Sequence, residues 1–271
     1  MIAYSSSPTM AWWSSGRTGK IGLVPTMGFL HDGHISLMQR LRADVDHLIV
    51  SIFVNPLQFG PNEDLDRYPR DPEGDAAKCE AAGVDVLFSP TDFYPSDFST
   101  TVSVARLTDR LCGASRPGHF DGVTTVVARL FGVTRCHVAC FGEKDYQQLA
   151  VVRRMVRDLA LPVEIIGAPL VRDADGLALS SRNKYLTPDD RQRALSLHRA
   201  LFAMRDAAAA GEHGVSALLA RGRSVLQADR EDYLEIVDAE SLEPLTELDR
   251  PARALVAAYV GSTRLIDNIA L

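Results

Sequence analysis

The feature that most constrains the fold is a regular alternation of strand-like and helix-like segments over the first 170 residues. Two apolar, β-branched runs at 20–26 and 47–55 enclose a helical stripe at 34–44, the pattern of two buried parallel strands joined by a helix. The alternation continues with strands expected at 84–90, 137–142 and 163–169, and with helices expected at 71–83, 121–135 and 144–160. Asp71 and Asp121 are the expected N-caps of the first two of these helices. This alternation predicts an α/β fold built on a doubly wound parallel sheet.

The pattern changes after residue 170. Thr187 is the expected cap of a long helix that Pro188 opens and Gly211 ends. The expected elements here are helices at 187–211 and 214–229, and strands at 232–242 and 252–268 that could pair antiparallel. Because 271 residues are many for a single core, we expect two domains, 1–170 with the parallel sheet and a smaller α+β domain at 171–271.

Charge and cysteine content narrow the class of protein. The net charge of −6 argues against binding to nucleic acid or to an anionic membrane, since both need a basic face. The N-terminal segment lacks the pattern of a signal peptide, and the apolar runs are too short to span a membrane. The cysteines do not have zinc-ligand spacing and are expected to be reduced thiols: Cys79, Cys112, Cys136 and Cys140. We expect a soluble cytoplasmic protein.

The first motif is VPTMGFLHDGH at 24–34, between the first expected strand and the following helix. Ligands of open parallel sheets bind at the carboxyl ends of strands, and a helix N-terminus attracts anions. Gly28 and Gly33 let the backbone approach a ligand, and His31 and His34 add donors. The motif predicts a cradle for a polyphosphate. The alternative is a pair of ordinary surface histidines.

Two further turns carry groups that suit a polyphosphate. FGEKDYQQL at 141–149 places Lys144 at a helix N-terminus, where a cation is favourable only if an anion lies beside it. DGLALSSRNKYL at 175–186 brings two serines, Arg182 and Lys184 into one loop. Each could instead be a solvated turn or a polar hinge. Three such turns at one sheet edge favour the nucleotide interpretation.

A fourth stretch, 51–71, runs irregularly after its strand and suits a different ligand. Loops of that length usually have a function. Asn55 and Gln58 offer neutral hydrogen bonds near the sheet edge, as hydroxyl groups or a carboxylate would require. The loop at 116–123 is similar and contains Arg116 and His119. The 55–72 segment is our candidate for a lid.

Together these motifs resemble pantothenate synthetase, the pantoate–β-alanine ligase family. The resemblance begins near residue 20, extends to the C-terminus and is dense from 24 to 186. The H-x-G-H motif alone indicates only the wider nucleotidylyltransferase superfamily; FVNPLQ, GEKD and SSR in this order narrow it to one member. Residues 1–19 do not match the longer helical segment of the family.

The resemblance implies a Rossmann-like N-terminal domain, a smaller C-terminal domain, a homodimer and a requirement for Mg²⁺ with unassigned metal ligands. It implies a two-step reaction, in which pantoate and ATP form pantoyl adenylate and pyrophosphate, and β-alanine then gives pantothenate and AMP. His34, Lys144 and Arg182 are the implied catalytic residues, and Gln58 and Gln148 the implied pantoate ligands. The implied ATP site comprises Met27, Gly28, Phe29, Leu30, His31, Asp32, Gly33, His34, Gly142, Glu143, Lys144, Asp145, Val171, Leu179, Ser180, Ser181 and Arg182.

Two other functions stay open at this point. The first is a different nucleotidylyltransferase that joins ATP to a phosphorylated acceptor; such an acceptor needs more cations than the loop with Asn55 and Gln58 provides. The second is a non-catalytic ATP-binding protein, which the full set of charged groups disfavours.

Overall fold

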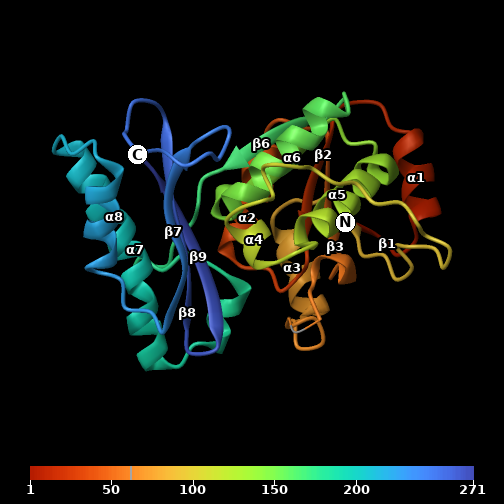
Figure 1. The fold of residues 1–271 in the computed structure, drawn as a ribbon. Coiled ribbons are helices and arrows are strands. Elements are labelled where there is room, and N and C mark those ends of the chain that lie inside the picture. The colour runs from red at the N-terminus through yellow and green to blue at the C-terminus, as the bar shows by residue number, and fades with distance from the viewer. Residues whose placement is uncertain (62) are drawn as a thin grey trace. The chain divides into compact units, whose positions relative to one another are not determined.

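The structure is a computed structural model that describes residues 1–61 and 63–271. It consists of two compact units, which Figure 1 shows as ribbons. The N-terminal unit comprises Met1–Glu143 and Val151–Pro169, and the C-terminal unit comprises Lys144–Ala150 and Leu170–Leu271. The short segment that contains Lys144 therefore packs with the later part of the chain.

The N-terminal unit is built on a parallel sheet that has six strands in the described residues. The strands are β1 (Ile2–Tyr4), β2 (Ile21–Thr26), β3 (His47–Ile52), β4 (Val86–Phe88), β5 (Val138–Gly142) and β6 (Glu164–Ala168), in the spatial order β1-β4-β3-β2-β5-β6. The predicted doubly wound parallel sheet is confirmed. The edge strand β1 was not predicted.

Helices connect these strands and cover the sheet. They are α1 (Ser7–Ser15), α2 (Asp32–Arg42), α3 (Pro72–Ala81), α4 (Cys112–Ser115), α5 (His119–Thr134) and α6 (Tyr146–Asp158). Asp71 caps α3 as predicted, since its carboxylate accepts the Gly74 N–H at 3.1 Å. The prediction for Asp121 is wrong. The helix α5 begins two residues earlier, with Gly118 as its N-cap, because the positive φ of 80° at Gly118 turns the chain into the helix there.

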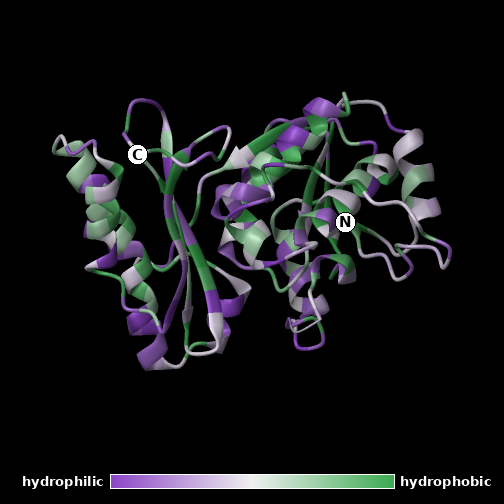
Figure 2. Cartoon of the chain, viewed as in Figure 1, coloured by the Kyte–Doolittle hydropathy of each residue, from purple (hydrophilic) through white to green (hydrophobic). Residues whose placement is uncertain are grey.

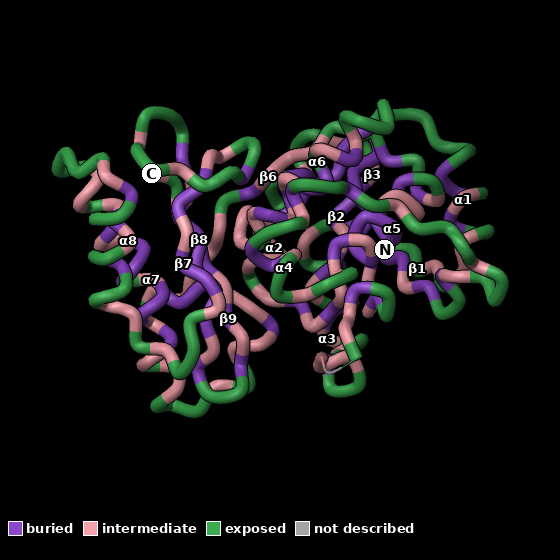
Figure 3. Tube along the Cα trace, viewed as in Figure 1, coloured by how far each residue is buried: buried purple, intermediate pink, exposed green. Residues whose placement is uncertain are grey.

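One hydrophobic core of the N-terminal unit lies between the sheet and α2 and α3. Val24, Leu48 and Val50 of the strands are completely buried against Met38 and Leu41 of α2. Figures 2 and 3 show these strands as apolar and buried along most of their length. A strand that is covered on both faces is a continuous apolar run, and such runs predicted these strands in the sequence.

The strand order reverses direction between β2 and β5. The chain runs from β2 outward through β3 to β4, then returns to pair β5 with β2 and continues to β6. In open parallel sheets this reversal opens a crevice at the carboxyl ends of the two central strands. The H-x-G-H turn follows β2, and Lys144 follows β5 by two residues.

The C-terminal unit contains an antiparallel sheet and two helices. In the described residues the sheet has three strands, β7 (Arg230–Asp238), β8 (Ala252–Val260) and β9 (Thr263–Ala270), and the helices are α7 (Pro188–Ala209) and α8 (Val215–Arg223). Leu197 and Leu201 of α7 and Leu218 of α8 pack with Ala254 and Val256 of β8. The expected α+β architecture is confirmed, and the 252–268 segment proves to be a hairpin of two strands. Within the described chain, helices long and apolar enough to cross a membrane are absent.

Candidate active site

The histidine pair lies at the junction of β2 and α2. His31 is the N-cap of α2, and its backbone N–H donates to Nδ1 of His34 at 3.2 Å. The two rings are 4.1 Å apart between centroids. Since Nδ1 of His34 accepts this hydrogen bond, the proton of its neutral ring is on Nε2, which is then a donor. The sequence motif therefore fixes the tautomer of one imidazole.

A carboxylate from α3 holds the backbone of the same turn. Gly28 and Phe29 both have positive φ, 83° and 51°. The Phe29 N–H donates to Oδ2 of Asp75 at 2.8 Å, and the Leu30 N–H donates to Oδ1 at 2.7 Å. Asp75 is only 1% exposed. This side chain stabilises an unfavourable conformation of the turn. It was missed in the sequence, because an Asp near a helix start indicates only a favourable dipole interaction.

Asn55 is buried, and its amide is fully occupied by the protein. Its Oδ1 accepts from the Tyr94 hydroxyl at 2.9 Å and from the Leu57 N–H at 3.2 Å. Its Nδ2 donates to the Gly122 carbonyl at 3.0 Å and to Oε1 of Gln58 at 3.1 Å. Asn55 therefore positions a neighbour, which differs from our expectation that it offers hydrogen bonds to a ligand.

Gln58 lies in the short 3-10 helix η1 (Pro56–Gln58) and is 8% exposed. Because Asn55 donates to Oε1 of Gln58, its Nε2 is presented as a donor. The partner of Nε2 is the sulfur of Met27 at 3.0 Å, and sulfur is a weak acceptor. The structure thus brings a residue of the H-x-G-H segment together with Gln58. A ligand oxygen would be a better acceptor for this amide than the sulfur.

The backbone of Gln58 is fixed by the loop before α5. Nδ1 of His119 is 2.8 Å from the Gln58 carbonyl oxygen, to which Arg116 also donates at 3.3 Å. Arg116 donates to both carboxylate oxygens of Glu63, at 2.6 and 2.7 Å. Burial alone would raise the pKa of Glu63, but hydrogen bonds from Arg116 outweigh it and hold this pKa below its ordinary value. Arg116 and His119 therefore act on the main chain that carries Gln58.

Lys144 lies in a 3-10 turn, η2 (Glu143–Asp145), directly before α6. Its side chain is 20% exposed, and its ammonium is 3.7 Å from the exposed carboxylate of Asp145. Its main-chain carbonyl accepts a hydrogen bond from Nδ2 of Asn268 at 3.0 Å. Gln148 lies one residue after the buried Gln147 in the first turn of α6 and is partly exposed. An ion pair with an exposed carboxylate is weak, so this contact holds the Lys144 ammonium only loosely.

The second segment of the C-terminal unit that the sequence predicts to bind nucleotide is a tight reversal of the chain. The Leu179 N–H donates to the Val171 carbonyl at 3.0 Å. Inside this reversal, Arg172 donates to both oxygens of Asp267, at 2.6 and 2.9 Å, and to the Gly176 carbonyl at 3.0 Å. Asp267 belongs to β9. A buried, bidentate ion pair thus fixes the reversal to the sheet.

The predicted phosphate loop continues from this reversal. Ser180 caps a short 3-10 helix, η3 (Ser181–Tyr185), through a 3.3 Å hydrogen bond from the Arg182 N–H to its hydroxyl. Ser181 is buried, and Arg182 is partly exposed. The predicted residues are divided between the units: 27–34, Gln58 and 142–143 belong to the N-terminal unit, and 144–145, Gln148 and 171–182 belong to the C-terminal unit. That His34, Lys144 and Arg182 share one nucleotide stays a prediction. The candidate lid at 55–72 includes residue 62, which lies outside the described residues.

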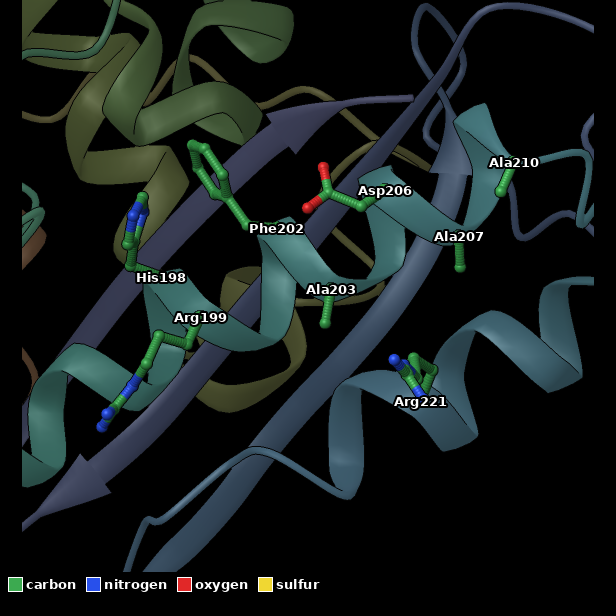
Figure 4. A pocket seen from close by; sticks show the side chains of 8 residues that line it. All are labelled: His198, Arg199, Phe202, Ala203, Asp206, Ala207, Ala210 and Arg221. Carbon is green, nitrogen blue, oxygen red and sulfur yellow. The ribbon is translucent and has the colours of Figure 1, made fainter.

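A separate hollow of about 500 Å³ lies along α7 and α8. Figure 4 shows that its lining comes from α7 and its C-terminal end, and from Arg221 on α8. The lining residues are His198, Arg199, Phe202, Ala203, Asp206, Ala207, Ala210 and Arg221. They share no member with the predicted site, so the hollow gives no support to that prediction.

A protein-only metal site does not fit the donor groups in the described parts of the chain. Among residues 1–61 and 63–271, His, Cys, Asp and Glu side chains do not form a group of three or more that could hold a metal ion. Mg²⁺ commonly keeps several waters and binds through substrate phosphates with one or two carboxylates. Any magnesium would therefore have to be held largely by a nucleotide, and we assign no protein ligand to it.

The strand order and the two turns after β2 and β5 define the class: an α/β protein with a Rossmann-like sheet and a smaller α+β unit. The family model of pantoate-beta-alanine ligase matches residues 3–270. The chain belongs to this family.

Individual relatives agree with this assignment. A pantothenate synthetase of Pelobacter propionicus is 53% identical over 256 residues, covering 93% of this chain and 90% of the relative. A crystal structure of pantothenate synthetase from Thermus thermophilus superimposes with a TM-score of 0.95 at 50% identity, covering 99% of both chains. A pantoate-beta-alanine ligase from Francisella tularensis, complexed with beta-gamma ATP and beta-alanine, has a TM-score of 0.81 at 35% identity, covering 99% of this chain and 97% of the other.

Proposed function

We propose that this chain condenses pantoate with β-alanine to give pantothenate, with consumption of ATP and release of AMP and pyrophosphate. Membership of the pantoate–β-alanine ligase family over residues 3–270 carries the proposal. In the first step a pantoate carboxylate oxygen attacks the α-phosphorus of ATP, and the bond to pyrophosphate breaks. In the second, the β-alanine nitrogen attacks the acyl carbon, loses a proton, and AMP leaves.

The first step brings a carboxylate against a triphosphate, so the site must neutralise charge while it aligns the reactants. We assign this role to His34, Lys144 and Arg182. Nδ1 of His34 accepts the His31 N–H, so we propose that Nε2–H of this ring donates to an oxygen that gains negative charge. Lys144 and Arg182 supply permanent positive charge. The turns 27–34, 142–145 and 171–182 are the proposed ATP-binding segments.

The hydrogen-bond directions at Gln58 favour an acid as the acceptor substrate. The amide NH₂ group donates to the sulfur of Met27, which is a weak acceptor. A carboxylate or hydroxyl oxygen of pantoate can replace this weak contact with a stronger one. We therefore propose Gln58 and Gln148 as pantoate ligands. A neutral amide suits pantoate better than a phosphorylated acceptor, which would require more cations.

The adenylate is a reactive mixed anhydride, and the second step must proceed before water attacks it. We propose that the domain formed by 171–271 closes over the nucleotide and pantoate site of the domain formed by 1–170. We also propose that Mg²⁺ accompanies ATP, that the enzyme is a homodimer and that it works in the cytoplasm. Free, buried thiols at all four cysteines are consistent with a reducing compartment.

The decisive experiment measures AMP release with pantoate and β-alanine, each omitted in turn. AMP formation should require both, whereas exchange of labelled pyrophosphate into ATP should require pantoate alone. Exchange that depends on a phosphorylated acceptor would favour the other nucleotidylyltransferase function. Binding of ATP without AMP formation under any condition would indicate a non-catalytic ATP-binding protein.

We predict that Lys144→Ala and His34→Ala each reduce adenylate formation by about 10²–10³-fold, the usual effect of losing one well-placed charge-stabilising donor. Both variants should remain folded, because neither side chain is a core contact. Lys20→Ala is the matched lysine control, since Lys20 pairs with Glu164 at the surface. Pyrophosphate exchange measures the loss, and near-normal exchange in Lys144→Ala would contradict the assignment.

A further inference from the structure

Two consecutive residues of β9, Asp267 and Asn268, each hold one of the nucleotide segments of the C-terminal unit. Both are only 4% exposed. Consecutive side chains of a strand point to opposite faces of the sheet. Asp267 is opposite Val256 in the register, and Asn268 is opposite Leu255. One strand thus offers a polar anchor on each of its two faces.

Asp267 lies on the face that is covered by α7. Val256, its register partner, belongs to the core that α7 and α8 form with the sheet. Arg172 stacks 5.7 Å from the ring centroid of Phe202 on α7 while it donates to both oxygens of Asp267. Because Arg172 also holds the Gly176 carbonyl, the reversal that leads into Ser180–Arg182 is fixed to this face.

Asn268 lies on the other face, where it donates to the Lys144 carbonyl at 3.0 Å. Two further contacts place the same segment there. Arg253 lies two residues before Leu255 in β8, so the two side chains are on the same face of the sheet. The Arg253 guanidinium lies 4.0 Å from the centroid of the Tyr146 ring. The Tyr146 hydroxyl donates to the Ala239 carbonyl at 2.7 Å. The main chain around Lys144 is therefore fixed by the antiparallel sheet.

We propose that Asp267 and Asn268 are positioning residues that set the separation between the Lys144 ammonium and the Ser180–Arg182 loop. The inference rests on the proposed function of these two segments in holding ATP phosphates. Asn268 acts through the Lys144 main chain, and Asp267 acts through Arg172. Because displacements of about 1 Å at such groups can cost two orders of magnitude in rate, two rigid anchors on one strand matter for phosphate binding.

The test is Asn268→Ala, with the dissociation constant of ATP measured by titration calorimetry and the KM of each substrate measured in the AMP-release assay. We expect the dissociation constant and the KM of ATP to rise about tenfold or more, while the KM of pantoate stays within twofold. Asp267→Asn keeps the side-chain shape but weakens the fork with Arg172, and it should shift the same two quantities. If Asn268→Ala does not fold, Asn268→Ser carries the test with a smaller void.

Asp232→Asn is the matched control. Asp232 accepts two hydrogen bonds from Arg264 within the same sheet, and their side chains are 19% and 17% exposed. Its substitution should lower Tm and leave ATP binding unchanged. The proposal is overturned if the β9 variants lower Tm as Asp232→Asn does but bind ATP as the unchanged chain does. Because ATP binding is measured directly, this result does not depend on whether the chain catalyses the proposed reaction. AMP release by the unchanged chain tests that reaction by itself.

Discussion

Tyr94 shows how one side chain can set the direction of the next hydrogen bond in a network. Burial raises the pKa of Tyr94 above its ordinary value, so its hydroxyl stays protonated and donates to Oδ1 of Asn55. Asn55 must then direct its Nδ2 to Oε1 of Gln58. Oε1 of Gln58 is thereby engaged as an acceptor, and Nε2 remains the donor of the amide. The direction of each hydrogen bond in this chain follows from the one before it.

We predict that Tyr94→Phe raises the KM of pantoate several-fold and leaves the KM of ATP unchanged. The substitution keeps the ring and its contacts with Phe53, Phe93 and Phe98, so Tm should fall only slightly. Steady-state kinetics of AMP release with each substrate varied measures the effect. Tyr259→Phe is the control, since its ring is stacked by Arg230 outside this network. An unchanged pantoate KM would show that the Leu57 N–H alone fixes Asn55.

Residue types and spacing were enough to find His34, Lys144 and Gln58 as candidates. The residues that orient them were beyond the same reasoning. Tyr94 is 39 positions from Asn55 and Asn268 is 124 positions from Lys144, and neither belongs to a motif. Their hydrogen-bond partners are set only when the chain folds. A lone Tyr or Asn in a strand or loop could have any of many partners, and the sequence does not distinguish them.

At the scale of elements, α3 does more than join β3 to β4. It carries Asp75 beneath the turn after β2, where the carboxylate accepts the N–H groups of Phe29 and Leu30. The turn itself has two consecutive residues of positive φ, a conformation that costs about 1–3 kcal/mol for the non-glycine residue. A buried carboxylate on a neighbouring helix offsets that cost.

We predict that Asp75→Asn lowers the free energy of unfolding by about 2–4 kcal/mol, because one of two charge-assisted hydrogen bonds is lost and an amide N–H then faces a backbone N–H. The dissociation constant of ATP should rise in parallel, since the turn carries His31 and His34. Urea unfolding and calorimetry measure the two effects. Asp71→Asn, at the cap of the same helix, should cost about 1 kcal/mol or less and leave ATP binding intact. Normal ATP affinity in Asp75→Asn would contradict the role of the turn.

The elements themselves followed from the sequence where their periodicity was long. The strands β2, β3, β5 and β6 were predicted because continuous apolar runs are typical of strands buried on both faces. The edge strand β1 is exposed or only partly buried, so it lacks the buried apolar run by which β4, equally short, was predicted. Lys144 was expected at the start of a helix, but η2 precedes α6 there, because helix boundaries depend on tertiary contacts such as the one to Asn268.

At the scale of the whole molecule, the chain passes between its two units three times, after Glu143, Ala150 and Pro169. The change of composition near residue 170 was visible in the sequence. The sequence did not show that Lys144–Ala150 belongs to the C-terminal unit, because this segment has the same helical pattern as the rest of α6.

The thiols are distributed unevenly between the units. The N-terminal unit contains Cys79, Cys112, Cys136 and Cys140.

We predict that three of these thiols report the unfolding of the N-terminal unit alone. Burial raises the pKa of Cys79 and Cys136 to about 12 and that of Cys140 to about 11. At pH 8 the thiolate fraction is then about one in a thousand or less, and the sulfur is also inaccessible. In a Cys112→Ser background, a chromogenic disulfide reagent should leave the folded protein unlabelled and label all three thiols in urea.

The control is a free cysteine peptide, which should react completely under the same conditions. Labelling of the folded protein at a comparable rate would mean that the N-terminal unit opens far more often than its buried core suggests. Labelling that rises together with the urea unfolding of the parallel sheet would agree with the prediction. Unfolding of the C-terminal unit requires a separate probe.

The proposed role of the two anchors on β9 has a consequence for a newly made polypeptide, because both anchors lie late in the chain. Translation delivers residues 144 and 182 well before residues 267 and 268. A nascent chain that has not yet released this hairpin from the ribosome already contains Lys144, but it lacks the hydrogen bond from Asn268 to the Lys144 carbonyl. If our proposal for β9 is correct, a chain that is terminated just before the hairpin should not bind ATP.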